Sequence, residues 1–146
     1  MTFGYEAPLQ NDIAITVATG WPTLTTAEFR AVRRIPEQYS EQALADSLAR
    51  SSEEVRQQIM AFSLRQSVPF LVGDTVQFDE PQLRIYRGAV YARSHADLLG
   101  YFAAVDMKEA GNNKAQDDEQ QDILLAQSNR GVRLLLGHGR CGVHSL

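Results

Sequence analysis

The feature that most constrains the fold is a run of small and apolar residues between positions 83 and 105. Its members recur at alternating steps of four and three, the spacing at which residues share one face of an α-helix. They are Ile85, Ala89, Ala92, Ala96, Leu99 and Ala103. Tyr86, Val90, Tyr101 and Val105 widen the apolar face. We therefore expect a long helix whose alanine seam lets another helix come close, at the centre of a bundle or between subunits.

A second long helix is expected over residues 41–66, with Ser40 as its N-cap. Its apolar face follows the same helical spacing. The stripe consists of Leu44, Leu48, Ser51, Val55, Ile59 and Phe62. Ser51 is the one small polar residue on this stripe, and it predicts a close approach to a neighbouring helix.

A short helix is expected to precede this one. Thr25 and Glu28 have the spacing of a capping box, in which each side chain satisfies a backbone amide near the helix start. Phe29 and Val32 give the helix an apolar side, and Pro36 ends it. Three arginines are expected to face outward: Arg30, Arg33 and Arg34.

The fourth helix is expected to follow a polar loop over residues 106–121. The acidic residues between positions 117 and 122 suit a helix N-terminus, where the macrodipole favours carboxylates. The apolar residues expected in this helix are Leu124, Leu134 and Leu135. Gly131 costs the helix about 1 kcal/mol, and Gly137 is the expected C-cap.

Between the second and third helices, the pattern in residues 67–82 changes to that of a β-hairpin. Gly73-Asp74 separates two β-favouring runs, which is a signal for a two-residue turn. A hairpin projecting from a helical body suits a contact with a neighbouring subunit or another protein. We expect Phe70, Leu71 and Phe78 to make that contact.

Together these patterns predict a mainly α protein: a four-helix bundle with a long central helix pair, a projecting hairpin and extended arms at both ends. Residues 1–24 form the expected N-terminal arm, residues 25–136 the helical domain and residues 137–146 a C-terminal arm. With 44% hydrophobic and 22% charged residues the chain has a globular balance. No apolar run is long enough to cross a membrane, so no membrane partner is expected.

The last ten residues contain motifs that could carry chemistry. Gly137, Gly139 and Gly142 have the G-x-G-x-x-G spacing, but they follow a helix, whereas a dinucleotide site needs a strand before them and a helix after them. His138, Cys141 and His144 could reach one zinc ion, and a small metal-binding protein stays open as an alternative. The segment offers no anchored base or oxyanion pocket for a cysteine nucleophile. We expect no enzyme activity, no cofactor and no metal.

A second alternative is a helix-turn-helix DNA-binding regulator. Arg30, Arg33 and Arg34, a short connection and the helix from 41 have the right outline. The connection lacks the usual glycine, and the second helix is acidic as often as basic where it would meet phosphates. A formal charge of −4 also disfavours a dedicated duplex binder.

Two stretches, residues 20–66 and 83–146, resemble the head completion proteins of contractile-tailed bacteriophages. The resemblance lies in the order of the segments: a Trp-Pro start, a short and then a long helix, the phrase Tyr101-Phe-Ala-Ala-Val-Asp106, a polar loop, a last helix, and the ending Arg140-Cys141-Gly-Val143-His-Ser145. Residues 1–19 and 67–82 depart from the family pattern, so contacts made there are not inherited.

The resemblance implies a virion protein at the head–tail junction, present in the host cytoplasm during assembly. It implies a twelve-fold ring of this chain beneath the portal protein. The ring joins a tail-side neck or terminator protein and retains packaged DNA, which passes without sequence-specific binding. On this reading the C-terminal segment is a flexible arm that docks on the portal. The docking residues would be Gly137, His138, Gly139, Arg140, Cys141, Val143 and Leu146.

Overall fold

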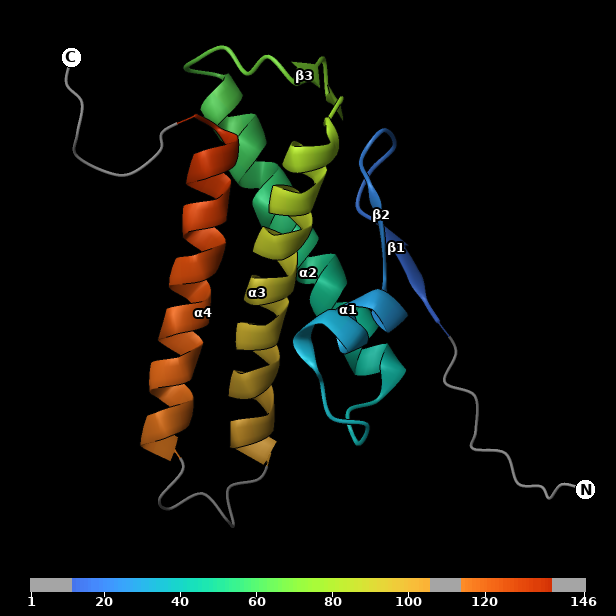
Figure 1. Cartoon of the computed structure of the whole chain (residues 1–146), viewed down its shortest axis with the longest axis vertical. Coiled ribbons are helices and arrows are strands. Elements are labelled where there is room, and N and C mark those ends of the chain that lie inside the picture. The colour runs from blue at the N-terminus through green and yellow to red at the C-terminus, as the bar shows by residue number, and fades with distance from the viewer. Residues whose placement is uncertain (1–11, 106–113, 138–146) are drawn as a thin grey trace, which may run out of the picture.

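The computed structural model describes residues 12–105 and 114–137, with the side chains of residues 12–102 and 118–137. Within these ranges the protein is mainly helical, as predicted. Figure 1 shows α3 and α4 side by side, with α2 crossing behind α3, and α1 and the strands β1 and β2 on the far side of α3 from α4. The helices are α1 (Thr26–Arg33), α2 (Glu41–Ser63), α3 (Glu80–Val105) and α4 (Lys114–Leu135). None of the described helices is long and apolar enough to span a membrane.

The short helix α1 begins as predicted. Thr25 has an extended backbone, and its hydroxyl accepts a hydrogen bond from the Glu28 amide at 3.2 Å. The reciprocal half of the capping box does not form, because the Glu28 carboxylate accepts a hydrogen bond from the Tyr91 hydroxyl instead. The helix closes at Arg34, whose backbone is left-handed, with φ +54°.

The helix α2 confirms its predicted stripe. Ser40 Oγ accepts from the Ala43 amide at 3.1 Å, and all six stripe residues are buried. Ser51 is only 2% exposed, in agreement with a close helix approach. The helix ends at Ser63, three residues earlier than expected. The amides of Arg65 and Gln66 both bond to the Phe62 carbonyl in a tight closing turn.

Residues 12–24 do not form the extended arm that the sequence suggested. The strands β1 (Ala14–Thr16) and β2 (Thr23–Thr25) pair antiparallel, with Ile15 opposite Leu24. Leu24 is 1% exposed and Trp21 is 4% exposed, so this segment is part of the hydrophobic core. The arm interpretation is therefore corrected for residues 12–24, because two large apolar side chains are anchored there. Residues 1–11 lie outside the described part.

The predicted hairpin is present between α2 and α3. The strands β3 (Leu71–Val72) and β4 (Thr75–Val76) pair antiparallel across the two-residue turn Gly73-Asp74. Gly73 has φ +66°, which glycine adopts without steric cost. The Val76 amide donates to the Gly20 carbonyl at 3.3 Å, so this hairpin is joined to the β1–β2 hairpin.

The last helix, α4, ends near Gly137 as predicted. Gly137 has φ +85°, and its amide donates to the Leu134 carbonyl at 3.1 Å. The buried face of α4 differs from the prediction at one position: Leu134 is 55% exposed. The residues that α4 buries follow steps of four, four and three. They are Leu124, Ser128, Val132 and Leu135.

Candidate functional site

The predicted helix seam is used inside the subunit. Ala89, Ala92 and Ala96 are buried, Ile85 and Leu99 are half-buried, and the side chain of Ala103 lies outside the described part. The small side chains let α4 approach the α3 backbone. Ser128 Oγ donates to the Ala89 carbonyl at 2.7 Å, and Gln121 Nε2 donates to the Ala96 carbonyl at 3.0 Å. The seam therefore joins α3 to α4, which is the first of the two roles that the sequence left open.

The predicted contact residues of the hairpin are also packed within the subunit. Phe70 is 5% exposed, and its ring lies 4.9 Å from that of half-buried Phe78. Phe78 in turn contacts Trp21 and Tyr86, with ring centroids 6.4 and 5.3 Å away. Trp21 Nε1 donates to the Asp74 carbonyl at 2.7 Å. The sequence did not anticipate this aromatic cluster, because its members come from four separate segments.

What the hairpin leaves accessible is small. Leu71 is half-buried, and Val72, next to the turn, is 56% exposed. Both of these apolar residues lie on β3. A contact with another protein through this hairpin would have to use Val72, part of Leu71 and the turn.

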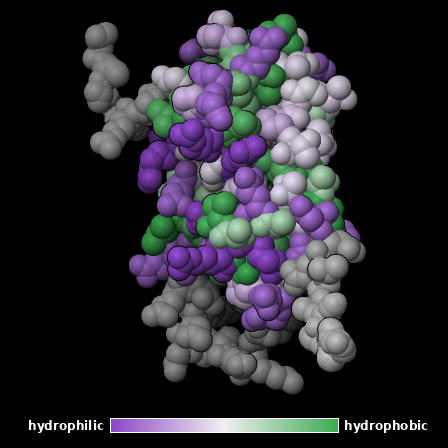
Figure 2. Space-filling model, turned by 45° about the vertical axis from the view of Figure 1, so that its right-hand side comes forward, coloured by the Kyte–Doolittle hydropathy of each residue, from purple (hydrophilic) through white to green (hydrophobic). Residues whose placement is uncertain are grey.

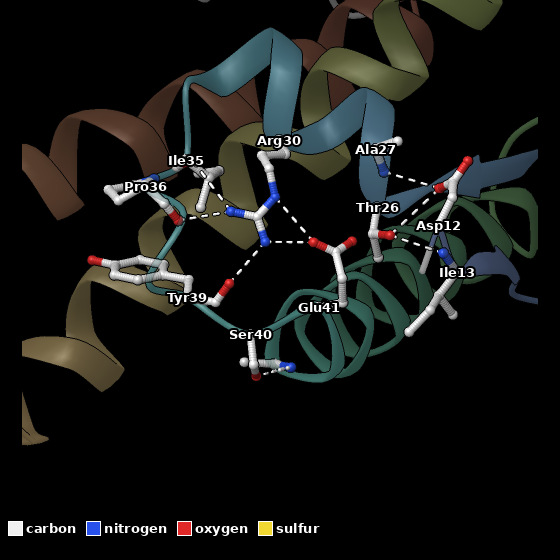
Figure 3. A network of polar contacts seen from close by, with 11 residues as sticks. Asp12, Ile13, Thr26, Ala27, Arg30, Ile35, Pro36, Tyr39, Ser40 and Glu41 are labelled. Atoms are coloured by element: carbon white, nitrogen blue, oxygen red, sulfur yellow. Dashed lines mark hydrogen bonds and ion pairs between the residues drawn. The ribbon is translucent and has the colours of Figure 1, made fainter. Parts of the chain in front are cut away.

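A charged network at the junction of α1 and α2 overturns the prediction for Arg30 (Figure 3). Its side chain is 14% exposed and points inward. Nε and Nη2 donate to Glu41 Oε1 at 3.0 and 2.5 Å. The same guanidinium donates to the carbonyls of Pro36 and Tyr39, both at 2.7 Å. Arg30 therefore holds the α1–α2 connection, and it is not available to bind phosphates as a helix-turn-helix protein would require.

A second inward-facing arginine, Arg93, lies in the bundle, and it was not predicted from the sequence. Arg93 of α3 is 7% exposed. Its Nε donates to Ser128 Oγ at 3.0 Å and its Nη2 to Asn129 Oδ1 at 2.9 Å, both on α4. Burial lowers the pKa of Arg93, partly offset by Glu54 of α2, whose carboxylate lies 3.6 Å away. Arg93 thus contacts two neighbouring helices at once.

His95 is the one histidine in the described part, and it is a hydrogen-bond acceptor. Its Nδ1 accepts from Arg33 Nε at 3.2 Å, which requires that nitrogen to be unprotonated. Burial and the neighbouring positive charge lower the pKa of His95 to about 4. Within the described residues no group of three or more His, Cys, Asp or Glu side chains could hold a metal ion. His138, Cys141 and His144 of the metal alternative lie outside these residues.

A groove of about 750 Å³ lies between the C-terminal ends of α2 and α4. Phe62 and Val132, both largely buried, contribute apolar surface to it. Its described lining residues include no Asp or Glu but three arginines: Arg65, Arg130 and Arg133. On the side that carries α1 and the β1–β2 hairpin, Figure 2 shows apolar side chains in small groups separated by polar ones.

These observations define the class of the protein. Its inward-facing arginines tie its own helices together, and its accessible features include a groove and a hairpin. It is a small, mainly helical protein.

The comparison with known proteins names the family. The chain belongs to the phage head completion protein (GPL) family, whose model matches residues 15–146. A relative in Haemophilus phage HP1 (strain HP1c1), described as a probable head completion/stabilization protein, is 28% identical over 142 residues. The match covers 91% of this chain and 92% of the relative. No solved structure matches. The role is thus structural, in completing the phage head, and the protein is associated with the virion.

Proposed function

We propose that the protein is a head-to-tail adaptor that forms a ring beneath the portal protein. The ring joins the portal to a tail-side neck or terminator protein and helps retain the packaged DNA. The support is membership of the head completion family together with a small, mainly helical body. In this role each subunit contacts its neighbours, the portal and the tail side.

The single observation that carries the proposal is how α4 ends. Gly137 takes a left-handed backbone at φ +85°, and its amide closes the last turn on the Leu134 carbonyl. This conformation turns the chain away from the helix axis at a defined point. We infer that residues 138–146 form an arm that docks on the portal, with Val143 and Leu146 as apolar anchors. A segment that orders only on binding loses entropy but reaches across a large surface.

The charge of the chain fits the passage of DNA without tight binding. The formal net charge is −4, and the guanidinium of Arg30 is engaged by Glu41 and backbone carbonyls. A negative surface disfavours non-specific retention of duplex DNA, because affinity for DNA comes mostly from neutralised phosphates. We infer that packaged DNA slides past the ring, and the helix-turn-helix alternative receives no support from the geometry.

The decisive experiment is light scattering of the purified protein, alone and with its cognate portal protein. The proposal expects a complex with about twelve copies per portal ring. Deletion of residues 138–146 should abolish comigration and leave the helical content and the melting temperature unchanged, since Gly137 still ends α4. A matched control replaces the nine residues with a Gly/Ser segment of equal length. Undiminished portal binding by either variant would refute the docking arm.

A further inference from the structure

The groove between α2 and α4 has a chemistry that specifies its occupant. Arg65 follows α2, and Arg130 and Arg133 lie on α4, so three arginines surround an apolar floor that has no Asp or Glu among its described lining residues. Neither Arg65 nor Arg130 forms an ion pair with any residue of the described part. In a chain of net charge −4 this is a local excess of positive charge. The matching occupant is a segment with carboxylates on one side and apolar side chains beside them.

The same helix carries such a segment at its other end. Glu119 and Asp122 are exposed and form no ion pair within the described residues. Next to them, Ile123 is 56% exposed, an unusual position for a large β-branched side chain. The helix dipole accounts for acids near the start of α4 and arginines near its end. It accounts neither for the exposed Ile123 nor for Arg65, which belongs to a different element.

The spacing of these charges along α4 indicates how two copies meet. Positions 119, 122, 126 and 133 follow helical steps of three, four and seven, so their side chains share one face. Position 126 is halfway between 119 and 133, and also halfway between 122 and 130. When a second copy of α4 lies antiparallel to the first, with the two helices centred on position 126, positions 119 and 122 of each helix therefore lie opposite positions 133 and 130 of the other. An acidic residue then faces an arginine at both ends of the contact. Ala126, which lines the groove, stands at the centre, where its small side chain permits close contact.

We propose that the groove binds α4 of a second copy of this chain, antiparallel and about a two-fold axis at Ala126. Glu119 pairs with Arg133 of the second copy, and Asp122 pairs with Arg130 of the second copy. In a two-fold contact each pair occurs twice. Ile123 then lies at the flank of the contact between the two α4 helices, on the side of α4 opposite Val132. The dimer is a state of the free protein that covers the groove before ring assembly, so the inference goes beyond the adaptor role and stands independently of it.

The test is the mass of the free full-length protein by sedimentation equilibrium, without portal, over a range of concentrations and salt. Wild type should dimerise, and more weakly at high salt. An acidic variant carries Arg130→Glu and Arg133→Glu, and a basic variant carries Glu119→Arg and Asp122→Arg. Each should raise the dimer dissociation constant at least about tenfold, since like charges then face each other. An equimolar mixture of the two should restore a dimer, because every pair is again opposite in sign.

The control is Arg84→Glu, an exposed position on α3 that does not line the groove, and this variant should dimerise like wild type. Far-UV circular dichroism checks that each variant is folded. Three outcomes would overturn the proposal: a wild type that stays monomeric, a dimer that tolerates both charge reversals, or a mixture that fails to pair. A monomer that dimerises only after removal of residues 138–146 would also overturn it, by assigning the groove to that segment. None of these outcomes bears on portal binding, which the adaptor experiment measures separately.

Discussion

Gly131 of α4 faces Ala89 of α3 so closely that a Cβ at position 131 would lie 3.2 Å from the Cβ of Ala89. A glycine that weakens its own helix therefore lies at a point where α3 and α4 come close together. The Ala89 carbonyl also accepts the Ser128 hydroxyl at 2.7 Å, which ties the same turn of α3 to α4. Small residues on both helices set their separation.

Enlarging this position should separate the two helices. We expect Gly131→Leu to lower the free energy of unfolding by about 1–3 kcal/mol, because the added atoms have no room at the contact. Urea denaturation followed by circular dichroism measures the change. Gly88→Ala is the matched control, since nothing lies within 4 Å of a Cβ added there. It should stabilise α3 by up to about 1 kcal/mol. If Gly131→Leu left the free energy of unfolding unchanged, α3 and α4 would not be in close contact at this position.

Truncation of Phe70 should destabilise the isolated subunit. Phe70 is 5% exposed and belongs to the aromatic cluster. Phe70→Ala should therefore lower the free energy of unfolding by about 3–5 kcal/mol. The exposed neighbour Val72 is the control, and Val72→Ala should change stability by less than about 0.5 kcal/mol. If Phe70→Ala instead weakened assembly while the monomer kept its melting temperature, Phe70 would be a contact residue.

Arg30 should matter for folding much more than its neighbour Arg34. Arg30→Ala leaves Glu41, which is 12% exposed, without the positive charge of Arg30 and removes the hydrogen bonds that Arg30 donates to the carbonyls of Pro36 and Tyr39. We expect a loss of about 2–4 kcal/mol in unfolding free energy. The side chain of Arg34 is exposed, so the unfolding free energy of Arg34→Ala should stay within about 0.5 kcal/mol of the wild-type value. Equal effects of the two substitutions in thermal melts would contradict the network.

The stability should fall as the pH drops from about 6.5 to about 4. The folded state holds the pKa of His95 at about 4, below its ordinary value of 6.5. Between these values the unfolded chain binds more protons than the folded chain, so acid favours unfolding. Melting temperatures across this range should show a smaller slope for His95→Gln, whose amide oxygen can still accept from Arg33. The NMR titration of His95 gives the pKa directly, and a value near 6.5 would refute the prediction.

The sequence predicted those elements whose signal is local. The stripe of α2 follows one helical period from Leu44 to Phe62, and every member is buried. The caps at Ser40 and Gly137 and the turn at Gly73 depend on one or two residues each, and the structure confirms all three. Such signals can be read from sequence because the partner groups lie within a few positions of each other.

The features that could not be predicted depend on partner residues that are distant in the sequence. Trp21 was placed in an arm because the carbonyl it binds, that of Asp74, is 53 positions away. Arg30 was assigned to solvent, since nothing in its own helix shows that Glu41 would face it. One weak signal existed for Arg93. It follows Ala89 by four residues and precedes Ala96 by three, so helical spacing already placed it beside the seam.

Trp21 is the chain's one tryptophan, and it is buried where the two hairpins meet α3. Its fluorescence therefore reports on that corner of the molecule alone, whereas circular dichroism follows the four helices. Coincident transitions in the two signals would mean that hairpins and helices unfold as one cooperative unit. An earlier change in fluorescence would mean that the hairpin corner opens first, and the same emission would then register any partner that binds there.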